Sequence, residues 1–287
     1  MNEDLICILG PTASGKTRYA VQMAMDKGGE ILSADSRQVY RGMNIGTGKD
    51  LSEYEVNGAK VPYHLIDIAN PGSKYNIFQY QKDFHAAYSD IKSRGVLPIL
   101  CGGSGLYIES VTMGYNLAEV PPDPALRERL EKLSLEELTE MLQSYKKLHN
   151  KTDIDSKKRV IRALEIAIHD VQNPLQMSET VQIKTKFIGI DVSREERIKR
   201  IDRRLDERLK QGMVEEVKGL IESGINPDDL IYYGLEYKFV TLYILGNLSF
   251  QEMRNQLATA IHQFAKRQMT WFRGMERRGI EIEWIKV

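Results

Sequence analysis

The sequence has little cysteine, no net charge and no long hydrophobic segment. Cys7 and Cys101 are the only cysteines among 287 residues, and both lie in apolar segments, so we expect two buried thiols in a reducing cytoplasm. No run of about 18 apolar residues predicts a membrane span. The acidic first residues do not resemble a signal peptide. The five histidines lack metal-ligand spacing, which argues against zinc.

Charge of either sign is balanced across the chain. Lys and Arg total 40, and Asp and Glu also total 40. The molecule as a whole therefore attracts neither polyanions nor polycations. A polyanionic partner would have to be held by local basic patches.

What the sequence does contain is a regular alternation of apolar segments and helical patterns. The expected strands are Leu5–Leu9, Glu30–Ala34, His64–Ile68, Leu97–Cys101 and Phe187–Val192, and the first helices are Lys16–Lys27 and Phe78–Arg94. This alternation predicts an α/β fold, a parallel sheet flanked by helices. Ligands of such sheets bind at the carboxyl ends of the strands, so the residues that follow each strand are the candidates for a site.

The alternation stops after Gly114. Three prolines follow, and residues from about 125 to 170 have the pattern of three charged amphipathic helices. We therefore predict a catalytic core of residues 1–114 and 186–287, interrupted by a mainly helical insertion domain at 115–185. Helices over Arg194–Ser223 and Phe250–Arg273 and a strand within Ile280–Val287 complete the expected core.

The segment ILGPTASGKT, residues 8–17, predicts a phosphate-binding loop. It fits the pattern G-x-x-x-x-G-K-[ST] between an expected strand and an expected helix. Backbone N–H groups and the helix N-terminus attract an anion, Lys16 neutralises phosphate oxygens, and the Thr17 hydroxyl can bind Mg²⁺. The loop alone does not identify the phosphate compound.

Two acidic residues follow expected strands and could act beside this loop. Asp35 opens the polar run DSRQVY, whereas Asp67 is followed at once by Ile68. We favour a catalytic or metal-binding role for Asp35; the alternative is a helix N-cap. The segment Asn150–Asp153 matches the guanine-reading tetrapeptide of GTPases, but it follows a polar helical stretch and not a buried strand, so we reject that reading.

Basic residues are concentrated in three places. Arg197, Arg204 and Arg208 fall on one border of an apolar helical stripe, where they could clamp an anion or simply pair with neighbouring acids in solvent. The other groups are Lys266–Gln268 and the cluster formed by Lys157–Arg159 and Arg162. Three separate groups in a neutral protein suggest a polyanion contacted at several points.

Taken together, these motifs resemble bacterial tRNA dimethylallyltransferases over nearly the whole chain. The motifs, in order, are GPTASGKT (10–17), DSRQVYRGMNIGTGK (35–49), HLIDI (64–68), CGGSGLYI (101–108), RVIRALEI (159–166), the 194–217 helix and AKRQMTWFR (265–273). The phosphate loop alone is unspecific, but seven motifs in this order are highly specific.

The resemblance implies transfer of the dimethylallyl group from dimethylallyl diphosphate to N6 of adenosine 37, next to the anticodon, in tRNAs that read codons beginning with U. Asp35 would be the general base. Thr12, Lys16, Arg204 and Mg²⁺ held near Thr17 would stabilise the diphosphate leaving group. The implied diphosphate-binding residues are Gly10, Thr12, Ala13, Ser14, Gly15, Lys16 and Thr17.

The same resemblance implies the contacts with tRNA. The residues expected to line the adenine pocket are Asp35, Ser36, Arg37, Gln38 and Ser104. The residues expected to contact the anticodon stem-loop are Arg127, Lys158, Arg159, Arg162, Lys266, Arg267 and Gln268. The resemblance further implies that adenine is extruded from the anticodon loop and that the helical insertion clasps the stem. It also implies a monomeric state and a cytoplasmic location.

Some residues depart from the family pattern, and other functions compete. Ser104 replaces the family's threonine, Ile261-His262 loses a cation, and the segment Tyr233–Tyr237 has no certain register. The nearest alternative is an adenylate isopentenyltransferase that modifies AMP, ADP or ATP. A P-loop small-molecule kinase and a paralogue that binds without catalysis are further alternatives.

Overall fold

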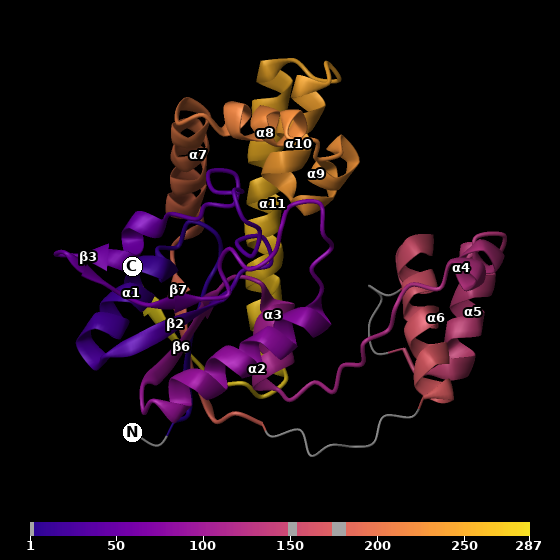
Figure 1. The fold of residues 1–287 in the computed structure, drawn as a ribbon, viewed down its shortest axis with the longest axis horizontal. Coiled ribbons are helices and arrows are strands. Elements are labelled where there is room, and N and C mark those ends of the chain that lie inside the picture. Colours follow the sequence, from indigo (N-terminus) through magenta and orange to yellow (C-terminus); the bar gives the residue numbers. More distant parts are fainter. Residues whose placement is uncertain (1–2, 149–153, 174–181) are drawn as a thin grey trace. The chain divides into compact units, whose positions relative to one another are not determined.

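The computed structural model describes residues 3–148, 154–173 and 182–287. They belong to two compact units (Figure 1). The core unit comprises residues 1–114 and 182–287, and the helical unit comprises residues 115–181. The predicted insertion extended to 185, but residues 182–185 belong with the core unit. The GTPase-like segment Asn150–Asp153 lies outside the described residues.

The core unit is built on a sheet in which six described strands are all parallel, with the order β5-β2-β6-β1-β7-β8. The strands are β1 (Leu5–Leu9), β2 (Gly29–Ala34), β5 (Tyr63–His64), β6 (Leu97–Gly102), β7 (Thr185–Asp191) and β8 (Ile282–Lys286). A short antiparallel pair, β3 (Glu55–Val56) and β4 (Ala59–Lys60), stands apart from it. The predicted α/β class with a parallel sheet is confirmed.

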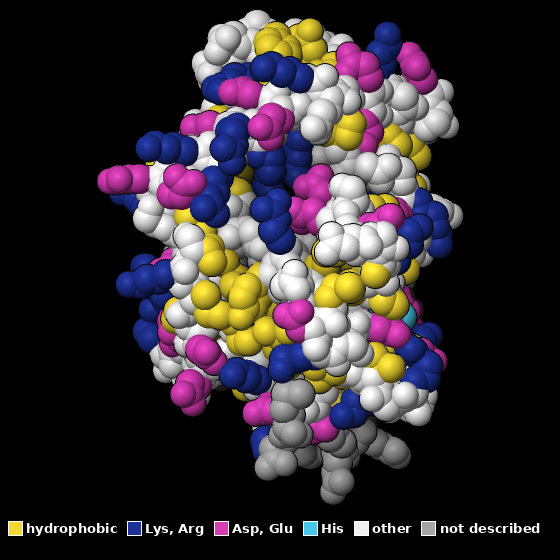
Figure 2. All heavy atoms as spheres, turned by 90° about the vertical axis from the view of Figure 1, so that its left-hand side faces the viewer, with side chains coloured by type: hydrophobic (Ala, Val, Ile, Leu, Met, Phe, Trp, Pro, Cys, Tyr) yellow, Lys and Arg dark blue, Asp and Glu magenta, His cyan; other side chains and the backbone are white. Residues whose placement is uncertain are grey.

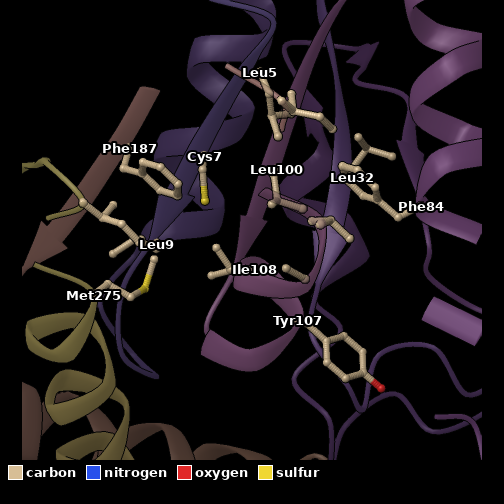
Figure 3. Close-up of a cluster of buried hydrophobic side chains, with 14 of the residues drawn as sticks. Leu5, Cys7, Leu9, Leu32, Phe84, Leu100, Tyr107, Ile108, Phe187 and Met275 are labelled. Carbon is tan, nitrogen blue, oxygen red and sulfur yellow. The ribbon is translucent and has the colours of Figure 1, made fainter. Parts of the chain in front are cut away.

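Helices cover both faces of the sheet because the strands are apolar on both sides. The helix α1 (Lys16–Lys27) lies on one face, and α2 (Ile77–Ser93), α3 (Gly105–Thr112) and α11 (Phe250–Arg277) lie on the other (Figure 1). Along β1, Leu5, Cys7 and Leu9 pack toward α2, α3 and α11 (Figure 3), whereas Ile6 and Ile8 pack toward α1. Both cysteines are buried and free, as predicted.

A second core forms where four helices pack against the first half of α11. They are α7 (Arg194–Lys210), α8 (Met213–Glu222), α9 (Pro227–Tyr233) and α10 (Leu235–Ile244). The prediction of one helix over Arg194–Ser223 is wrong, because the chain breaks at Gly212. This residue has φ = 101°, a left-handed conformation that glycine adopts without the steric cost of a Cβ atom.

The predicted strand His64–Ile68 is also largely wrong. Only Tyr63 and His64 pair with β2. The backbone then turns, with positive φ angles at Leu65 and Asp67. The Asp67 carboxylate lies 2.5 Å from the Nζ atom of Lys49, whose side chain is fully buried. The apolar run therefore contributes core residues without continuing the sheet.

The helical unit contains the amphipathic helices that the sequence predicts. They are α4 (Pro124–Leu130), α5 (Leu135–Tyr145) and α6 (Lys157–Gln172). Buried leucines such as Leu126, Leu138 and Leu164 form a core of their own. In neither unit is any described helix long and apolar enough to cross a membrane.

Candidate active site

Two cavities adjoin at the carboxyl ends of β1, β2 and β6. The phosphate cavity, of about 470 Å³, lies between the loop after β1 and helix α7. The apolar cavity, of about 580 Å³, lies between the loop after β6, the start of α10 and the middle of α11. The residues that line both cavities are Thr12, Lys16, Asp35, Thr47 and Arg204. The structure thus brings all four predicted catalytic residues to one junction.

The loop after β1 has the geometry of an anion cradle. Ala13 and Gly15 both have positive φ angles, and α1 begins at Lys16 without a side-chain cap on its first N–H groups. The Nζ atom of Lys16 lies 3.4 Å from the carbonyl oxygen of Pro11. Of the predicted diphosphate-binding residues, Ser14 and Gly10 are buried and do not line either cavity, and the other five line the phosphate cavity.

Thr12 is held from two helices. Arg204 of α7 donates a hydrogen bond from Nη2 to the Thr12 hydroxyl oxygen. The backbone N–H of Thr12 donates to Oε1 of Gln268 in α11, at 2.8 Å. Thr12, which is predicted to stabilise the leaving group, is therefore held by contacts from residues more than 190 positions away in the sequence.

Burial lowers the pKa values of the two cations at the junction. Burial, together with the positive charge of the neighbouring Arg208, lowers the pKa of Arg204 to about 10. Burial also lowers the pKa of Lys16, while Cys101 and Asp35 oppose that shift.

The predicted edge of Arg197, Arg204 and Arg208 does not form a single exposed border. Arg204 reaches the junction, and Arg208 is buried with its Nη2 atom 3.6 Å from an oxygen of Asp50. Arg197 lines neither cavity. Two arginines that the sequence analysis did not single out, Arg200 and Arg203, line the phosphate cavity instead. Figure 2, which faces the α7 side of the molecule, shows Lys and Arg side chains gathered in its upper half.

Asp35 follows β2 and lies beside both cavities. Its carboxylate accepts a hydrogen bond from the backbone N–H of Arg37 at 2.9 Å. Residues 36–39 form a turn, so the alternative reading of Asp35 as a helix N-cap is wrong. Asp67, the other acid considered, lines neither cavity and pairs with Lys49.

The residues expected around adenine are divided between the cavities. Ser36, Arg37 and Ser104 line the apolar cavity, and the backbone N–H of Ser36 donates to Oγ of Ser104 at 3.2 Å. Gln38 lines the phosphate cavity instead, and its Nε2 atom donates to the carbonyl oxygen of Gly48. The apolar cavity is the larger of the two and is bounded by broad apolar side chains, among them Tyr107, Leu235, Phe264 and Trp271.

The predicted RNA-contacting residues of α11 point in different directions. Lys266 and Arg267 are exposed, and the guanidinium of Arg267 lies 5.9 Å from the centre of the Phe264 ring. Gln268 is only 7% exposed, and both ends of its amide are bonded to backbone groups. This side chain faces the phosphate loop and also lines the apolar cavity, so its contact with tRNA stays a prediction.

In the helical unit, the predicted cations are paired but partly exposed. Arg127 and Arg162 both bond to the buried carboxylate of Glu165, at 2.7 Å and 3.0 Å. Arg159 pairs with Asp155, one turn earlier. Lys158 is exposed on the same helix. Each guanidinium retains N–H groups that could meet phosphate oxygens.

Several cavity residues were missed by sequence reasoning. Thr47 reaches the junction on the loop between β2 and β3, for which no periodic pattern exists. Glu236 lines the apolar cavity, where burial raises its pKa and Arg208 and Arg204 oppose the rise. Its segment had no certain register in the sequence. Arg200 could have been found from its position four residues before Arg204, and Arg203 from its position three residues after Arg200.

A magnesium site was expected near Thr17, which lines the phosphate cavity together with Asp50 and Glu53. Among the described residues, no group of three or more His, Cys, Asp or Glu side chains could hold a metal ion. Mg²⁺ in phosphate sites is bound by one or two protein ligands, substrate oxygens and water, and does not need such a group. The donors present therefore fit Mg²⁺.

Comparison with known proteins gives a consistent result. The model of the IPP transferase family matches residues 38–275, and that of the isopentenyl transferase family matches residues 3–67. The chain is 60% identical to tRNA dimethylallyltransferase 2 of Bacteroides fragilis, over 98% of this chain and 92% of the relative. It is 61% identical to tRNA dimethylallyltransferase 1 of Porphyromonas gingivalis, over 98% and 93%. The crystal structure of a tRNA isopentenylpyrophosphate transferase from Bacillus halodurans superimposes with a TM-score of 0.71 at 33% identity, covering 99% of this chain and 90% of that one.

Proposed function

The chain belongs to the IPP transferase family of prenyl-transferring enzymes, and on that premise we propose that it transfers the dimethylallyl group from dimethylallyl diphosphate to N6 of adenosine 37 in tRNA. The tRNAs would be those that read codons beginning with U. The observation that supports this proposal is the junction of a phosphate cavity with an apolar cavity at Thr12, Asp35 and Arg204. A prenyl diphosphate likewise consists of a charged diphosphate and an apolar prenyl group.

Asp35 is the general base in this proposal. The exocyclic amine of adenine is a weak nucleophile because its lone pair is delocalised into the ring. As the nitrogen attacks C1 of the prenyl group, Asp35 accepts an N6 proton, and the bond from C1 to the diphosphate oxygen breaks. The hydrogen bond from the backbone N–H of Arg37 orients the Asp35 carboxylate and occupies only one of its two oxygens.

The phosphate cavity stabilises the diphosphate that leaves. Negative charge grows on the bridging oxygen as the C1–O bond breaks. The hydroxyl of Thr12, Lys16 and Arg204 lie together where both cavities meet, so their donors are in place before the reaction begins. Mg²⁺ held at Thr17 would neutralise charge on the diphosphate oxygens.

Adenine must leave the anticodon-loop stack to reach Asp35, so the apolar cavity would hold it extruded. The exposed Lys266 and Arg267 would contact the RNA backbone near the mouth of this cavity, and the cations of α6 would contact the stem. We also propose that the protein acts as a monomer in the cytoplasm.

The deciding experiment offers unmodified tRNA, AMP and ATP side by side with labelled dimethylallyl diphosphate and Mg²⁺. We expect label in tRNA alone, at the position next to the anticodon. Label in AMP or ATP but not in tRNA would favour the adenylate isopentenyltransferase alternative. Membership of a prenyl-transferring family already argues against the P-loop kinase alternative.

A further inference from the structure

Gln268 has an environment that its sequence neighbours do not predict. It follows Lys266 and Arg267, which are exposed, but its own side chain is buried. Its Oε1 atom accepts a hydrogen bond from the backbone N–H of Thr12 at 2.8 Å, and its Nε2 atom donates to the carbonyl oxygen of Gly103 at 2.9 Å. One amide group thus joins α11, the phosphate loop and the loop after β6.

The absence of a side chain at Gly103 leaves room for this amide. A Cβ atom on Gly103 would lie 2.4 Å from Nε2 of Gln268, so only glycine leaves room for the contact. The next residue, Ser104, accepts a hydrogen bond from the backbone N–H of Ser36, which follows Asp35. The bonds of Gln268 therefore extend in one direction to Thr12 and in the other to the segment that bears Asp35.

We propose that Gln268 is a positioning residue that sets the separation between the leaving-group side of the site, at Thr12, and the base side, at Asp35. This inference rests on the proposed function. In a displacement at C1, the attacking nitrogen and the departing oxygen stand on opposite sides of the carbon. A misplacement of about 1 Å can lower such a rate on the order of 100-fold.

The two bonds require a neutral amide. An amide accepts through its oxygen and donates through its nitrogen, whereas an ionised carboxylate only accepts. Gln268→Glu keeps the acceptor for Thr12 but places a carboxylate oxygen against the carbonyl oxygen of Gly103. Protonation of the introduced carboxyl restores a donor, and burial raises the pKa of that carboxyl. In the Gln268→Glu variant, the hydrogen bond to Gly103 therefore depends on pH.

We expect Gln268→Glu to lower kcat at saturating tRNA about 100-fold near pH 8 while tRNA affinity stays unchanged. The ratio of its kcat to that of the wild type should rise as the pH falls. Gln256→Glu, which adds the same charge on an exposed part of α11, is the matched control and should leave kcat and its pH profile unchanged. If Gln268→Glu does not fold, Gln268→Met should show the loss of kcat without recovery at low pH.

A kcat of Gln268→Glu equal to that of the wild type at saturating tRNA would overturn the inference. If its tRNA binding were weaker at the same time, Gln268 would be an RNA contact. Binding of inorganic diphosphate with Mg²⁺ separates this inference from the proposed function, because it needs no turnover. If the wild-type protein binds diphosphate but does not prenylate tRNA, only the proposed function is contradicted. Gln268→Glu should bind diphosphate about tenfold more weakly than the wild type in either case. Equal diphosphate affinities of the two proteins would contradict the positioning role.

Discussion

Asp35 and Asp67 both follow apolar segments, but the structure places them in different environments. Asp35 lies where the two cavities meet. Asp67 lies 2.5 Å from Lys49, which also donates to the carbonyl oxygen of Tyr40 at 2.7 Å. Both residues follow an apolar segment, although Asp35 opens a polar run and Asp67 is followed by Ile68. What separates them is that β2 continues to Ala34, whereas the chain leaves the sheet after His64.

The two residues should respond oppositely to the loss of charge. Asp35→Asn keeps an acceptor for the N–H of Arg37 but removes the base, so we expect prenyl transfer to fall on the order of 100- to 10,000-fold with tRNA binding and stability preserved. Single-turnover assays, tRNA binding and urea unfolding measure the three quantities. Full activity of the variant would show that another group accepts the proton.

Asp67→Asn should instead weaken the fold. It leaves the buried Lys49 ammonium without its counter-charge, and we expect the free energy of unfolding to fall by about 3 kcal/mol. Transfer activity should persist at temperatures where the variant stays folded. A variant as stable as the wild type would mean that the bonds of Lys49 to Tyr40 and Asn44 suffice.

At the scale of elements, helix α8 secures the loop that brings Thr47 to the site. The Glu216 carboxylate accepts from the backbone N–H groups of Asn44, Ile45 and Gly46 at 2.7 to 3.0 Å, and from the hydroxyl of Tyr237 at 2.7 Å. A carboxylate offers enough lone pairs for four donors. The loop therefore has a defined shape despite lacking regular secondary structure.

Glu216→Gln tests this attachment. The amide offers one acceptor oxygen and turns two N–H donors toward backbone donors, so we expect unfolding to require about 2 kcal/mol less free energy and prenyl transfer to fall through displacement of Thr47. Glu215→Gln removes the same charge from the exposed neighbouring position and should change neither quantity. Equal behaviour of the two variants in urea unfolding and transfer assays would argue against the role of Glu216.

The edge of the sheet contains an ion pair whose effect depends on pH. Arg94 donates two hydrogen bonds to Glu30 of β2, at 2.5 and 2.7 Å, and His64 of β5 lies 2.8 Å away. The hydrogen bonds from Arg94 lower the pKa of Glu30 to about 2, His64 acts in the same direction, and burial opposes them. The folded state therefore holds this carboxyl ionised at pH values where the unfolded chain protonates it.

Because the folded pKa of Glu30 lies below the unfolded one, its contribution is complete above about pH 5 and is lost as the pH falls toward 2. The shift from 4.5 to about 2 corresponds to at most about 3 kcal/mol, which solvent around the half-exposed Arg94 reduces. Urea unfolding from pH 7 to pH 3 should show that Glu30→Gln is less stable at pH 7 and loses less stability on acidification. Parallel pH profiles for both proteins would contradict this.

At the scale of the whole molecule, the proposed functions of diphosphate binding and tRNA binding involve different units. The described residues that line both cavities all belong to the core unit, while the helical unit presents Arg127, Arg159 and Arg162 with their acidic partners. A protein without net charge gains affinity for RNA only through such local groups. Binding of tRNA should therefore depend on both units, and binding of diphosphate on one.

The salt dependence of tRNA binding measures these contacts. Lys266→Gln and Arg159→Gln should each weaken tRNA binding and reduce the slope of log affinity against log salt by about 1, and the double variant by about 2. Diphosphate binding should stay unchanged in all three. An unchanged salt slope would place the RNA surface elsewhere on the molecule.

The sequence by itself determined most strands of the sheet, the position of the loop after β1 and the family. These follow from local order: apolar runs with the period of strands, glycines at a fixed spacing before Lys16, and motifs in a set sequence. Their ranges agree closely with β1, α1 and β6. The α/β class and the resemblance to tRNA dimethylallyltransferases are both confirmed.

Tertiary structure alone decided which polar side chains face the site. The periodicity of α7 could not tell that Arg204 meets Thr12 while Arg197 does not reach a cavity, and the position of Gln268 beside two exposed cations concealed its bonds to Thr12 and Gly103. Such bonds join residues more than 160 positions apart. Helical spacing specifies which side chains share a face, but the partner of that face is set only when the helices pack against the sheet.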